Sequence, residues 1–327
     1  MTLVLTASQL EALVDRPATI DAVSRIFAEI AEGRAAQPGP TSMATAADTG
    51  RYILMSAVSD GTGTAGVKLL ADVPGNAARG LPTQRSMILV VDREDGEPVA
   101  LLHGGVPTRV RTAAASAVAT DVLARPDSRV LGLVGAGALA REHVRQLRGI
   151  RPFDRLVVWS RTRASADALA AAAEWDGRID VVGDVHAVFA EADVVCTLTP
   201  SSSPIVEGGW LRPGQHVNVV GARPRPDERE VDGEALRRSS IWVDDRATAE
   251  TKSGDLLLAV AEGAVRLDDV VGSIGEVIAG RARGRRDAAE ITLFDSVGIG
   301  AQDLAIADLL IRAARAQGVG WAVDLGA

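Results

Sequence analysis

The chain has 327 residues, of which 47% are hydrophobic and 24% charged. This balance is that of a globular protein with a substantial core, and the length favours two domains. The formal net charge of −8 argues against nucleic acid as a partner, and the lack of an apolar run of about 18 residues argues against a membrane span. The single cysteine, Cys196, excludes an internal disulfide, and no cluster has metal-ligand spacing. Because no basic and apolar leader opens the chain, we expect a cytoplasmic protein.

The first 125 residues predict helices followed by short strands. An apolar stripe and the capping residues Thr6 or Ser8 predict two helices within 7–33. Turn signals then separate four β-rich segments, at 52–58, 66–70, 86–91 and 99–102. An alanine-rich helix over 108–124 leads to a compact linker at 125–128.

Beyond the linker, apolar strands alternate with helices. Strands are predicted at 130–134, 156–159, 179–182, 193–197, 216–220, 240–243 and 291–294, with helices to about 149, at 164–175 and at 301–316. This rhythm is typical of βαβ units and a parallel sheet. We therefore predict an α/β fold in which a Rossmann-type, doubly wound parallel sheet over 126–295 is joined to a second, α+β domain made of 1–125 with 296–327.

A glycine turn after the first of these strands is the clearest motif. Gly135, Gly137 and Ala140 form the G-x-G-x-x-A version of the dinucleotide fingerprint, between a predicted strand and a predicted helix. Gly135 allows the tight turn, Gly137 lets a pyrophosphate approach the backbone, and the helix N-terminus offers N–H groups. The residues expected to hold the pyrophosphate are Gly135, Ala136, Gly137, Ala138 and Leu139.

The end of the second strand decides between NAD(H) and NADP(H). An NAD site usually carries a carboxylate there for the ribose hydroxyls. This chain has Ser160, Arg161 and Thr162 instead, and an arginine between two hydroxyls suits a 2′-phosphate. We therefore expect NADP(H) to be preferred over NAD(H).

Several cations precede the glycine turn, among them Arg51, Lys68, Arg109 and Arg111. Arg109 and Arg111 lie two apart at a helix start, so they cannot face the same side. Helix starts also disfavour cations, so a cation there indicates an anionic partner, either a substrate carboxylate or the pyrophosphate. The residues alone leave open a second interpretation, in which these are solvated surface arginines.

A set of motifs in a fixed order resembles the ornithine cyclodeaminase, mu-crystallin and archaeal alanine dehydrogenase family. The resemblance runs over about residues 45–310 and rests on segments 111–114 (RTAA), 135–137 (GAG), 197–201 (TLTPS), 218–222 (NVVGA), 253–255 (SGD) and 294–298 (FDSVG). It implies a homodimer, with the N-terminal half and the C-terminal helix forming the substrate-binding and dimerisation domain.

The resemblance also implies roles for individual residues. Arg51, Lys68 and Arg111 match the family's binders of the substrate carboxylate, and such a clamp would present C2 of an amino or imino acid to the nicotinamide. Thr199, Val220 and Gly298 would lie near the nicotinamide end of the cofactor.

Two positions depart from the family pattern. Arg223 stands where the cyclodeaminases and alanine dehydrogenases carry an acid/base aspartate, and an arginine can neither accept nor readily release a proton. His103 stands where relatives usually have an aspartate. It is either a structural residue or a catalytic one, since it lies close in sequence to Arg111.

These observations favour NADPH-dependent reduction of a small 2-imino acid, a ketimine such as 1-pyrroline-2-carboxylate or 1-piperideine-2-carboxylate, to the amino acid. Lys68 or a water would keep the imine protonated. The alternatives are ornithine cyclodeaminase or a related amino-acid deaminase or dehydrogenase using NAD, an opine-type or diaminopropionate-pathway dehydrogenase, and a mu-crystallin-like protein that binds NADPH without turnover. The sequence does not choose the imino acid.

Overall fold

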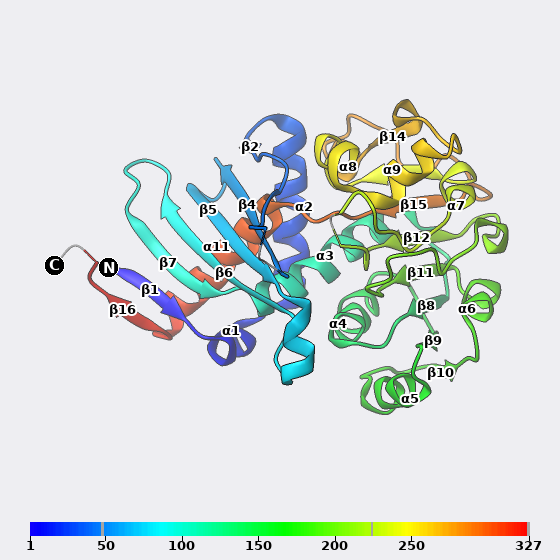
Figure 1. The fold of residues 1–327 in the computed structure, drawn as a ribbon, viewed down its shortest axis with the longest axis horizontal. Coiled ribbons are helices and arrows are strands. Elements are labelled where there is room, and N and C mark those ends of the chain that lie inside the picture. Colours follow the sequence, from blue (N-terminus) through cyan, green and yellow to red (C-terminus); the bar gives the residue numbers. More distant parts are fainter. Residues whose placement is uncertain (47–48, 224, 326–327) are drawn as a thin grey trace. The chain divides into compact units, whose positions relative to one another are not determined.

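The computed structural model describes residues 1–46, 49–223 and 225–325. The chain divides into two compact units, Met1–Arg111 with Ile299–Ala327 and Thr112–Gly298 (Figure 1). The division falls inside helix α3 (Gly105–Leu123), whereas we expected the boundary after this helix. The roles expected of the two domains remain predictions. No helix in the described residues is long and apolar enough to cross a membrane.

The first unit is built on a mixed, mostly antiparallel sheet whose strands run in the order β16-β1-β7-β6-β5-β4-β2, with β3 also paired to β4. Among the described residues of this sheet, only β1 and β7 pair in parallel. The strands are β1 (Thr2–Leu5), β2 (Ala35–Ala36), β3 (Thr41–Met43), β4 (Arg51–Ser59), β5 (Thr64–Asp72), β6 (Gln84–Asp92), β7 (Pro98–His103) and β16 (Trp321–Val323).

One face of this sheet is buried and the other is open. Helix α11 (Gly300–Gln317) packs on β4 and β5, and α2 (Arg16–Glu32) packs on α11. Residues of β4, β5, β6 and β7 alternate between the faces, so Met55, Lys68, Ile88 and Leu102, which pair across the strands, are all buried. The shorter helix α1 (Ala7–Leu13) begins after the N-cap Thr6, as predicted, and a 3-10 helix, η1, covers Pro74–Arg79.

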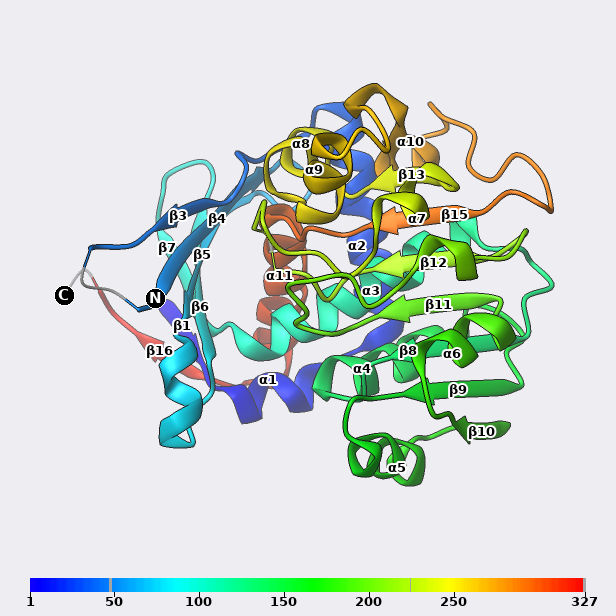
Figure 2. The same cartoon turned by 45° about the vertical axis from the view of Figure 1, so that its right-hand side comes forward.

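The second unit contains a parallel sheet with the strand order β10-β9-β8-β11-β12-β15-β13-β14, and Figure 2 shows the strands from β10 at the bottom up to β13. Its strands are β8 (Val130–Val134), β9 (Arg155–Trp159), β10 (Arg178–Val181), β11 (Val194–Thr197), β12 (His216–Val219), β13 (Ser240–Val243), β14 (Val270–Ser273) and β15 (Thr292–Asp295). Its helices besides α3 are α4 (Ala138–Leu147), α5 (Arg163–Ala172), α6 (Val185–Glu191), α7 (Gly233–Arg237), α8 (Arg246–Lys252), α9 (Gly254–Ala261) and α10 (Ile274–Ile278), with short 3-10 turns η2 (Gly208–Trp210) and η3 (Leu267–Asp269). The predicted fold class, a Rossmann-type parallel sheet joined to a second α+β domain, is confirmed.

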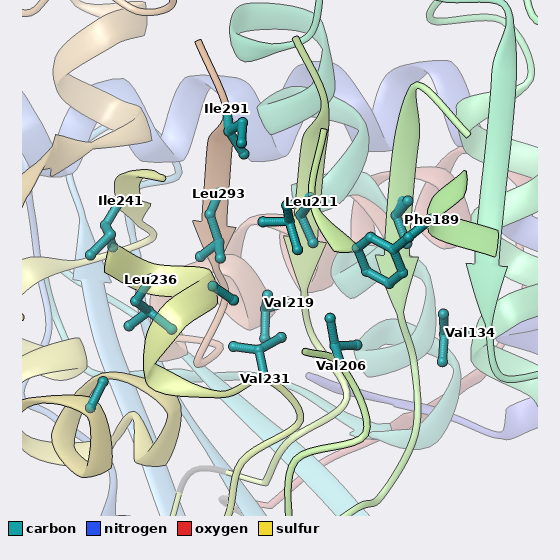
Figure 3. Close-up of a cluster of buried hydrophobic side chains, with 14 of the residues drawn as sticks. Val134, Phe189, Val206, Leu211, Val219, Val231, Leu236, Ile241, Ile291 and Leu293 are labelled. Atoms are coloured by element: carbon teal, nitrogen blue, oxygen red, sulfur yellow. The ribbon is translucent and has the colours of Figure 1, made fainter. Parts of the chain in front are cut away.

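A large hydrophobic cluster of the second unit lies on one face of the parallel sheet. Figure 3 shows Phe189 of α6 and Leu236 of α7 among strand residues such as Val219 and Leu293. The strands are valine- and leucine-rich because both faces of a parallel sheet are covered. Cys196 of β11 is fully buried, accepts a hydrogen bond from Asn218 Nδ2 at 3.5 Å, and has a pKa raised to about 12 by burial.

Candidate active site

The glycine turn joins β8 to α4 at the carboxyl edge of the parallel sheet. Gly135 has φ of +118°, a conformation that favours glycine, and its N–H donates to the carbonyl of Trp159 at 2.8 Å. A Cβ on Gly135 would lie 2.8 Å from the Leu198 carbonyl oxygen, so the loops after β8, β9 and β11 meet here. Gly137 caps α4, and a Cβ added there would have no atom within 4 Å. A ligand can therefore approach this backbone directly.

A cavity of about 370 Å³ opens in front of this turn, within the range of small-molecule sites. It lies where the order of the parallel strands reverses, between β8 and β11, the usual ligand position in such sheets. Its lining comes from three loops: Gly135, Ala136 and Gly137 after β8; Trp159, Ser160, Arg161, Thr162 and Ser165 after β9; and Leu198, Thr199, Pro200, Ser201 and Ile205 after β11. The first N–H groups of α4, at Ala138 and Leu139, have no partner inside the helix.

The part of the cavity after β9 is cationic and rich in hydroxyls. Arg161 is exposed, and no hydrogen bond or ion pair of its side chain occurs within the described chain. Arg163, two residues later, is instead held by Asp167 at 2.9 Å. The lining of the cavity includes no carboxylate. Arg161 is thus the available cation at this end of the cavity.

In the first unit, Lys68 of β5 and Arg111 of α3 meet at one carboxylate. Lys68 Nζ lies 2.6 Å from Asp303 Oδ2, and Arg111 Nε lies 3.0 Å from Asp303 Oδ1. Arg111 Nη1 also donates to Gln302 Oε1 at 2.8 Å, and Lys68 Nζ donates to Thr108 Oγ1 at 3.4 Å. All three charged groups are buried, with side-chain exposures of 1%, 6% and 2% for Lys68, Arg111 and Asp303.

The cluster holds two positive charges and one negative charge. Burial lowers the pKa of Lys68 to about 8; Asp303 acts against burial and Arg111 acts with it. Burial also works against the charged form of Asp303, but the two cations outweigh it and lower the pKa of that carboxyl. The cluster therefore keeps one positive charge in excess below about pH 8, and an anion of charge −1 would neutralise it.

Arg51 and His103 stand on opposite faces of the same sheet. Arg51 alternates in step with Ile53 and Met55 of β4, and Met55 pairs with Lys68, so Arg51 lies on the Lys68 face, at an exposed strand end. His103 pairs with Met87, which pairs with Leu69, and all three are exposed on the other face. His103 Nδ1 accepts the Gly105 N–H at 3.3 Å. Local geometry therefore does not place His103 beside the cations. Its partner Met87 is adjacent to Ile88, the partner of Lys68, and successive residues of a strand point to opposite faces of the sheet.

Thr199, Val220 and Gly298 lie at the carboxyl edge of the parallel sheet. Glu230 ties two of these loops together: its carboxylate accepts hydrogen bonds from Thr197 Oγ1, the N–H and Oγ1 of Thr199 and the Gly221 N–H, at 2.6 to 2.7 Å. Burial raises the pKa of Glu230 although these bonds act in the opposite direction. Gly298 has φ of +81°, and its N–H donates to Asp244 Oδ2 at 2.6 Å.

More buried acids occupy the same edge. Asp295 Oδ2 accepts a hydrogen bond from Ser253 Oγ at 2.6 Å, and Asp255 Oδ1 accepts the Glu230 and Val231 N–H groups. Burial raises the pKa of Asp244 to about 7 and that of Asp295 to about 6. Their hydrogen bonds fix the loops that carry Gly298 and Glu230.

Arg223, which stands where the resemblance predicts an acid/base aspartate, is paired with a carboxylate. Arg223 follows β12 and Ala222, and its Nε lies 2.6 Å from Glu228 Oε2. A small pocket beside it is lined by Ala222, Arg223, Ser253, Asp255 and Asp295, among others.

Sequence reasoning missed Asp303, Gln302 and Glu230. Asp303 is the fourth residue of α11, in a stretch otherwise dominated by alanine, leucine and isoleucine. A carboxylate inside such an apolar stretch is a signal of a buried ion pair, because acidic residues are almost never fully buried unless paired. Glu230 lies in a charged stretch, Asp227 to Asp232, that is interrupted only by Val231, so the composition of its neighbourhood did not indicate burial.

The family described as ornithine cyclodeaminase/mu-crystallin matches residues 1–318. A Δ1-pyrroline-2-carboxylate reductase of Paracoccus denitrificans is 36% identical over 266 residues, which are 81% of this chain and 84% of that protein.

Two solved structures resemble the fold over nearly its whole length. One is the Δ1-pyrroline-2-carboxylate reductase of Thermococcus litoralis in complex with NADH and L-proline, with a TM-score of 0.93, 32% identity, and coverage of 98% of this chain and 100% of that one. The other is an archaeal alanine dehydrogenase dimer with bound NAD, with a TM-score of 0.93, 31% identity and 99% of both chains covered.

Proposed function

The chain belongs to the ornithine cyclodeaminase/mu-crystallin family, and we propose that within it the protein is an oxidoreductase that reduces a small 2-imino acid with NADPH. The substrate would be a ketimine of the 1-pyrroline-2-carboxylate or 1-piperideine-2-carboxylate type, and the product the corresponding amino acid. The observation that carries this proposal is the excess positive charge of the buried cluster of Lys68, Arg111 and Asp303.

The cluster supports recognition of a monocarboxylate. Arg111 Nη2 and one proton of the Lys68 ammonium have no partner within the described chain, so both cations can donate to a bound anion. Arg51 lies on the same face of the sheet, four residues before Met55, which pairs with Lys68. Four residues span about 13 Å along a strand. The long side chain of Arg51 can approach the same small molecule from the open end.

The cavity after β8, β9 and β11 fits a nicotinamide dinucleotide. Gly135 makes the tight turn, Gly137 leaves open space before the backbone, and the unpaired N–H groups of Ala138 and Leu139 can hold a pyrophosphate. When bound, the reduced nicotinamide supplies a hydride to C2 of the imine. Thr199, Val220 and Gly298 would contact the nicotinamide end, and Glu230 would hold the Thr199 loop in place.

The remaining requirement is a proton at the imine nitrogen. Reduction of C=N takes one hydride at carbon and one proton at nitrogen, and a protonated imine accepts hydride more readily. Lys68, with a pKa of about 8, is charged at neutral pH and is our candidate for keeping the imine protonated, directly or through a water.

Arg161 supports NADPH over NADH. Its guanidinium lines the cavity between Ser160 and Thr162, and no protein carboxylate competes for it within the described residues. A 2′-phosphate would give it a charge-assisted, bidentate partner, whereas the ribose hydroxyls of NADH would find no acidic acceptor there.

A homodimer is the expected assembly. The open face of the first unit's sheet exposes large apolar side chains, with Leu69 at 46%, Met87 at 51% and Leu89 at 39% exposure, and these residues are neighbours across β5 and β6. Contiguous exposed apolar residues of this kind are typical of protein interfaces. We propose that a second copy of this chain covers the face.

Cofactor consumption tests the activity. Pyrroline-, piperideine- and thiazoline-2-carboxylates are mixed with NADPH, and ornithine and lysine with NAD, while absorbance at the nicotinamide band and ammonia are followed. The proposal expects NADPH oxidation stoichiometric with one or more imino acids. Release of ammonia from ornithine without net cofactor change would identify a deaminase. Absence of both reactions would identify a binding protein. Either result would contradict the proposal.

A further inference from the structure

We propose that Asp303 is a positioning residue of the substrate site: it holds Lys68 and Arg111 side by side and sets their joint charge to +1. This inference rests on the proposed role of the two cations in binding a substrate carboxylate. Its observations are the 2.6 Å contact of Oδ2 with Lys68 Nζ and the 3.0 Å contact of Oδ1 with Arg111 Nε.

The start of α11 is built to bring Asp303 to this place. A Cβ on Gly300 would lie 2.5 Å from the Ser56 carbonyl oxygen, so only glycine lets the helix start touch β4. The Ala301 N–H donates to Gln37 Oε1 at 3.1 Å, which fixes the same turn from another side. Asp303 follows in the first turn of this helix, and its carboxylate therefore has little freedom to move away from β5.

The contacts leave the cations free to bind. Asp303 Oδ1 accepts a hydrogen bond from Arg111 Nε, and Asp303 Oδ2 forms an ion pair with Lys68 Nζ. Gln302 Oε1 accepts a hydrogen bond from Arg111 Nη1, and no partner for Nη2 is found in the described part of the chain. A purely structural ion pair would be expected to balance its charges, because an uncompensated buried charge is costly. Here one charge remains uncompensated, which is the arrangement expected of a site completed by an anionic ligand.

Asp303 also acts on the protonation of Lys68. The charged groups that influence Lys68 are Asp303 from α11 and Arg111 from α3, while the flanking strands pair Met55 and Ile88 with it. Burial and Arg111 lower the pKa of Lys68, and Asp303 raises it. Removal of the negative charge leaves only the lowering influences, so the pKa of Lys68 would fall below its present value of about 8.

The test is the pH dependence of Asp303→Asn, with Asp308→Asn as matched control. Asp308 lies on the same helix and forms an ion pair with Arg312 at 2.7 Å, outside the cluster. Two readouts are taken between pH 5 and 10: kcat/KM for the best imino acid, and binding of L-proline measured by calorimetry. A charged Lys68 is needed in both, so each falls as pH rises through its pKa.

We expect the alkaline limb of both profiles to move down by at least about one pH unit in Asp303→Asn, which means a loss of about fivefold or more at pH 8 and of about tenfold or more at the alkaline end of the range. Part of the loss should be recovered at pH 6. Asp308→Asn should keep the limb of the unaltered protein. Asp303→Glu keeps the charge and should keep the limb near its original pH, even with weaker binding, so it serves if the asparagine variant does not fold.

A uniform loss at all pH values in Asp303→Asn, or a shifted limb in Asp303→Glu or Asp308→Asn, would overturn the inference. The outcome is separable from that of the proposed function. If the unaltered protein reduces no imino acid, the function fails, yet the L-proline profiles still decide the role of Asp303.

Discussion

The guanidinium of Arg223 and the carboxylate of Glu228 are joined at 2.6 Å, and Arg225 contacts the other oxygen of the same carboxylate at 2.8 Å. Arg223, which stands where the resemblance predicts an acid/base aspartate, is therefore held in place by a buried acid. A guanidinium remains protonated at any relevant pH, so this position offers no general base.

Ornithine with NAD should give little ammonia and proline. A general acid–base group contributes about 10²–10⁴-fold, and a deaminase without it should fall far below ordinary turnover of roughly 1 s⁻¹. Ammonia release is measured on the same preparation that oxidises NADPH with imino acids, which controls for loss of activity. Turnover near 1 s⁻¹ would show that another residue replaces the aspartate.

Arg161→Ala should lose the preference for NADPH. A charge-assisted contact to phosphate is worth about 1.5–3 kcal/mol, which corresponds to tenfold to a hundredfold in affinity, while NADH binding should change little. Arg163→Ala is the control, because Arg163 is also exposed but is paired with Asp167. Isothermal titration with both cofactors decides. Equal or tighter binding of NADH by the unaltered protein contradicts the assignment.

Arg111→Ala should abolish productive substrate binding and leave NADPH affinity within a fewfold. Truncation of one partner of a buried charge pair costs about 2–5 kcal/mol, here with Asp303 also losing a contact. Arg111→Lys should restore only part of kcat/KM, because an ammonium lacks the planar fork. Arg109→Ala is the matched control, since Arg109 lies two residues away and pairs with Glu11. An unchanged kcat/KM in Arg111→Ala would remove it from the site, and a collapse of NADPH binding would make the pyrophosphate its partner.

Gly135→Ala and Gly137→Ala should separate stability from cofactor binding. Gly135 has φ of +118° and faces the Leu198 carbonyl, so alanine there should lower the free energy of unfolding by about 1–3 kcal/mol. Gly137 has φ of −79° and open space around it, so alanine should cost at most about 1 kcal/mol as an N-cap change but should obstruct a pyrophosphate. Urea midpoints and NADPH titrations of both variants test this, and full NADPH affinity in Gly137→Ala would refute the assigned position of the cofactor.

Leu69→Lys should weaken the dimer. The charge would be placed in the middle of the open apolar face, where desolvation without a partner is costly. Val271→Lys is the control, because Val271 is 50% exposed on β14 of the other unit. Sedimentation velocity over a range of concentrations reports the dissociation constants. A dimer unaffected by Leu69→Lys, or an unaltered protein that sediments as a monomer, would show that this face is not the interface.

Local signals predicted much of the fold. The strand over 130–134 was predicted with its observed bounds because a continuous apolar run ends at a glycine turn. The strands at 2–5 and 270–273 were not predicted, although both occur. Each is only four residues long and depends on pairing with distant neighbours, such as β7 for β1, and such pairing leaves little trace in the strand itself.

The sequence indicated only part of the buried cluster. Lys68 and Arg111 were singled out as cations, but the carboxylate that joins them comes from a helix 192 residues beyond Arg111, and no periodicity connects the two. His103 shows a different limit. Its closeness to Arg111 in the sequence suggested that it lies near the cations. The face of the sheet on which it lies is instead determined by the register of β6 with β7. The register depends on the whole sheet.

The burial of Cys196 makes the protein chemically simple to label. Its thiol is the only one in the chain, has a pKa of about 12 and is fully enclosed in β11, and thiolate is the reactive form. Maleimides and similar thiol reagents should therefore not react with the folded protein. A cysteine introduced at an exposed position outside the proposed dimer face, such as Val271, would be the sole reactive thiol, so fluorophores or spin labels can be attached there without first removing the native residue.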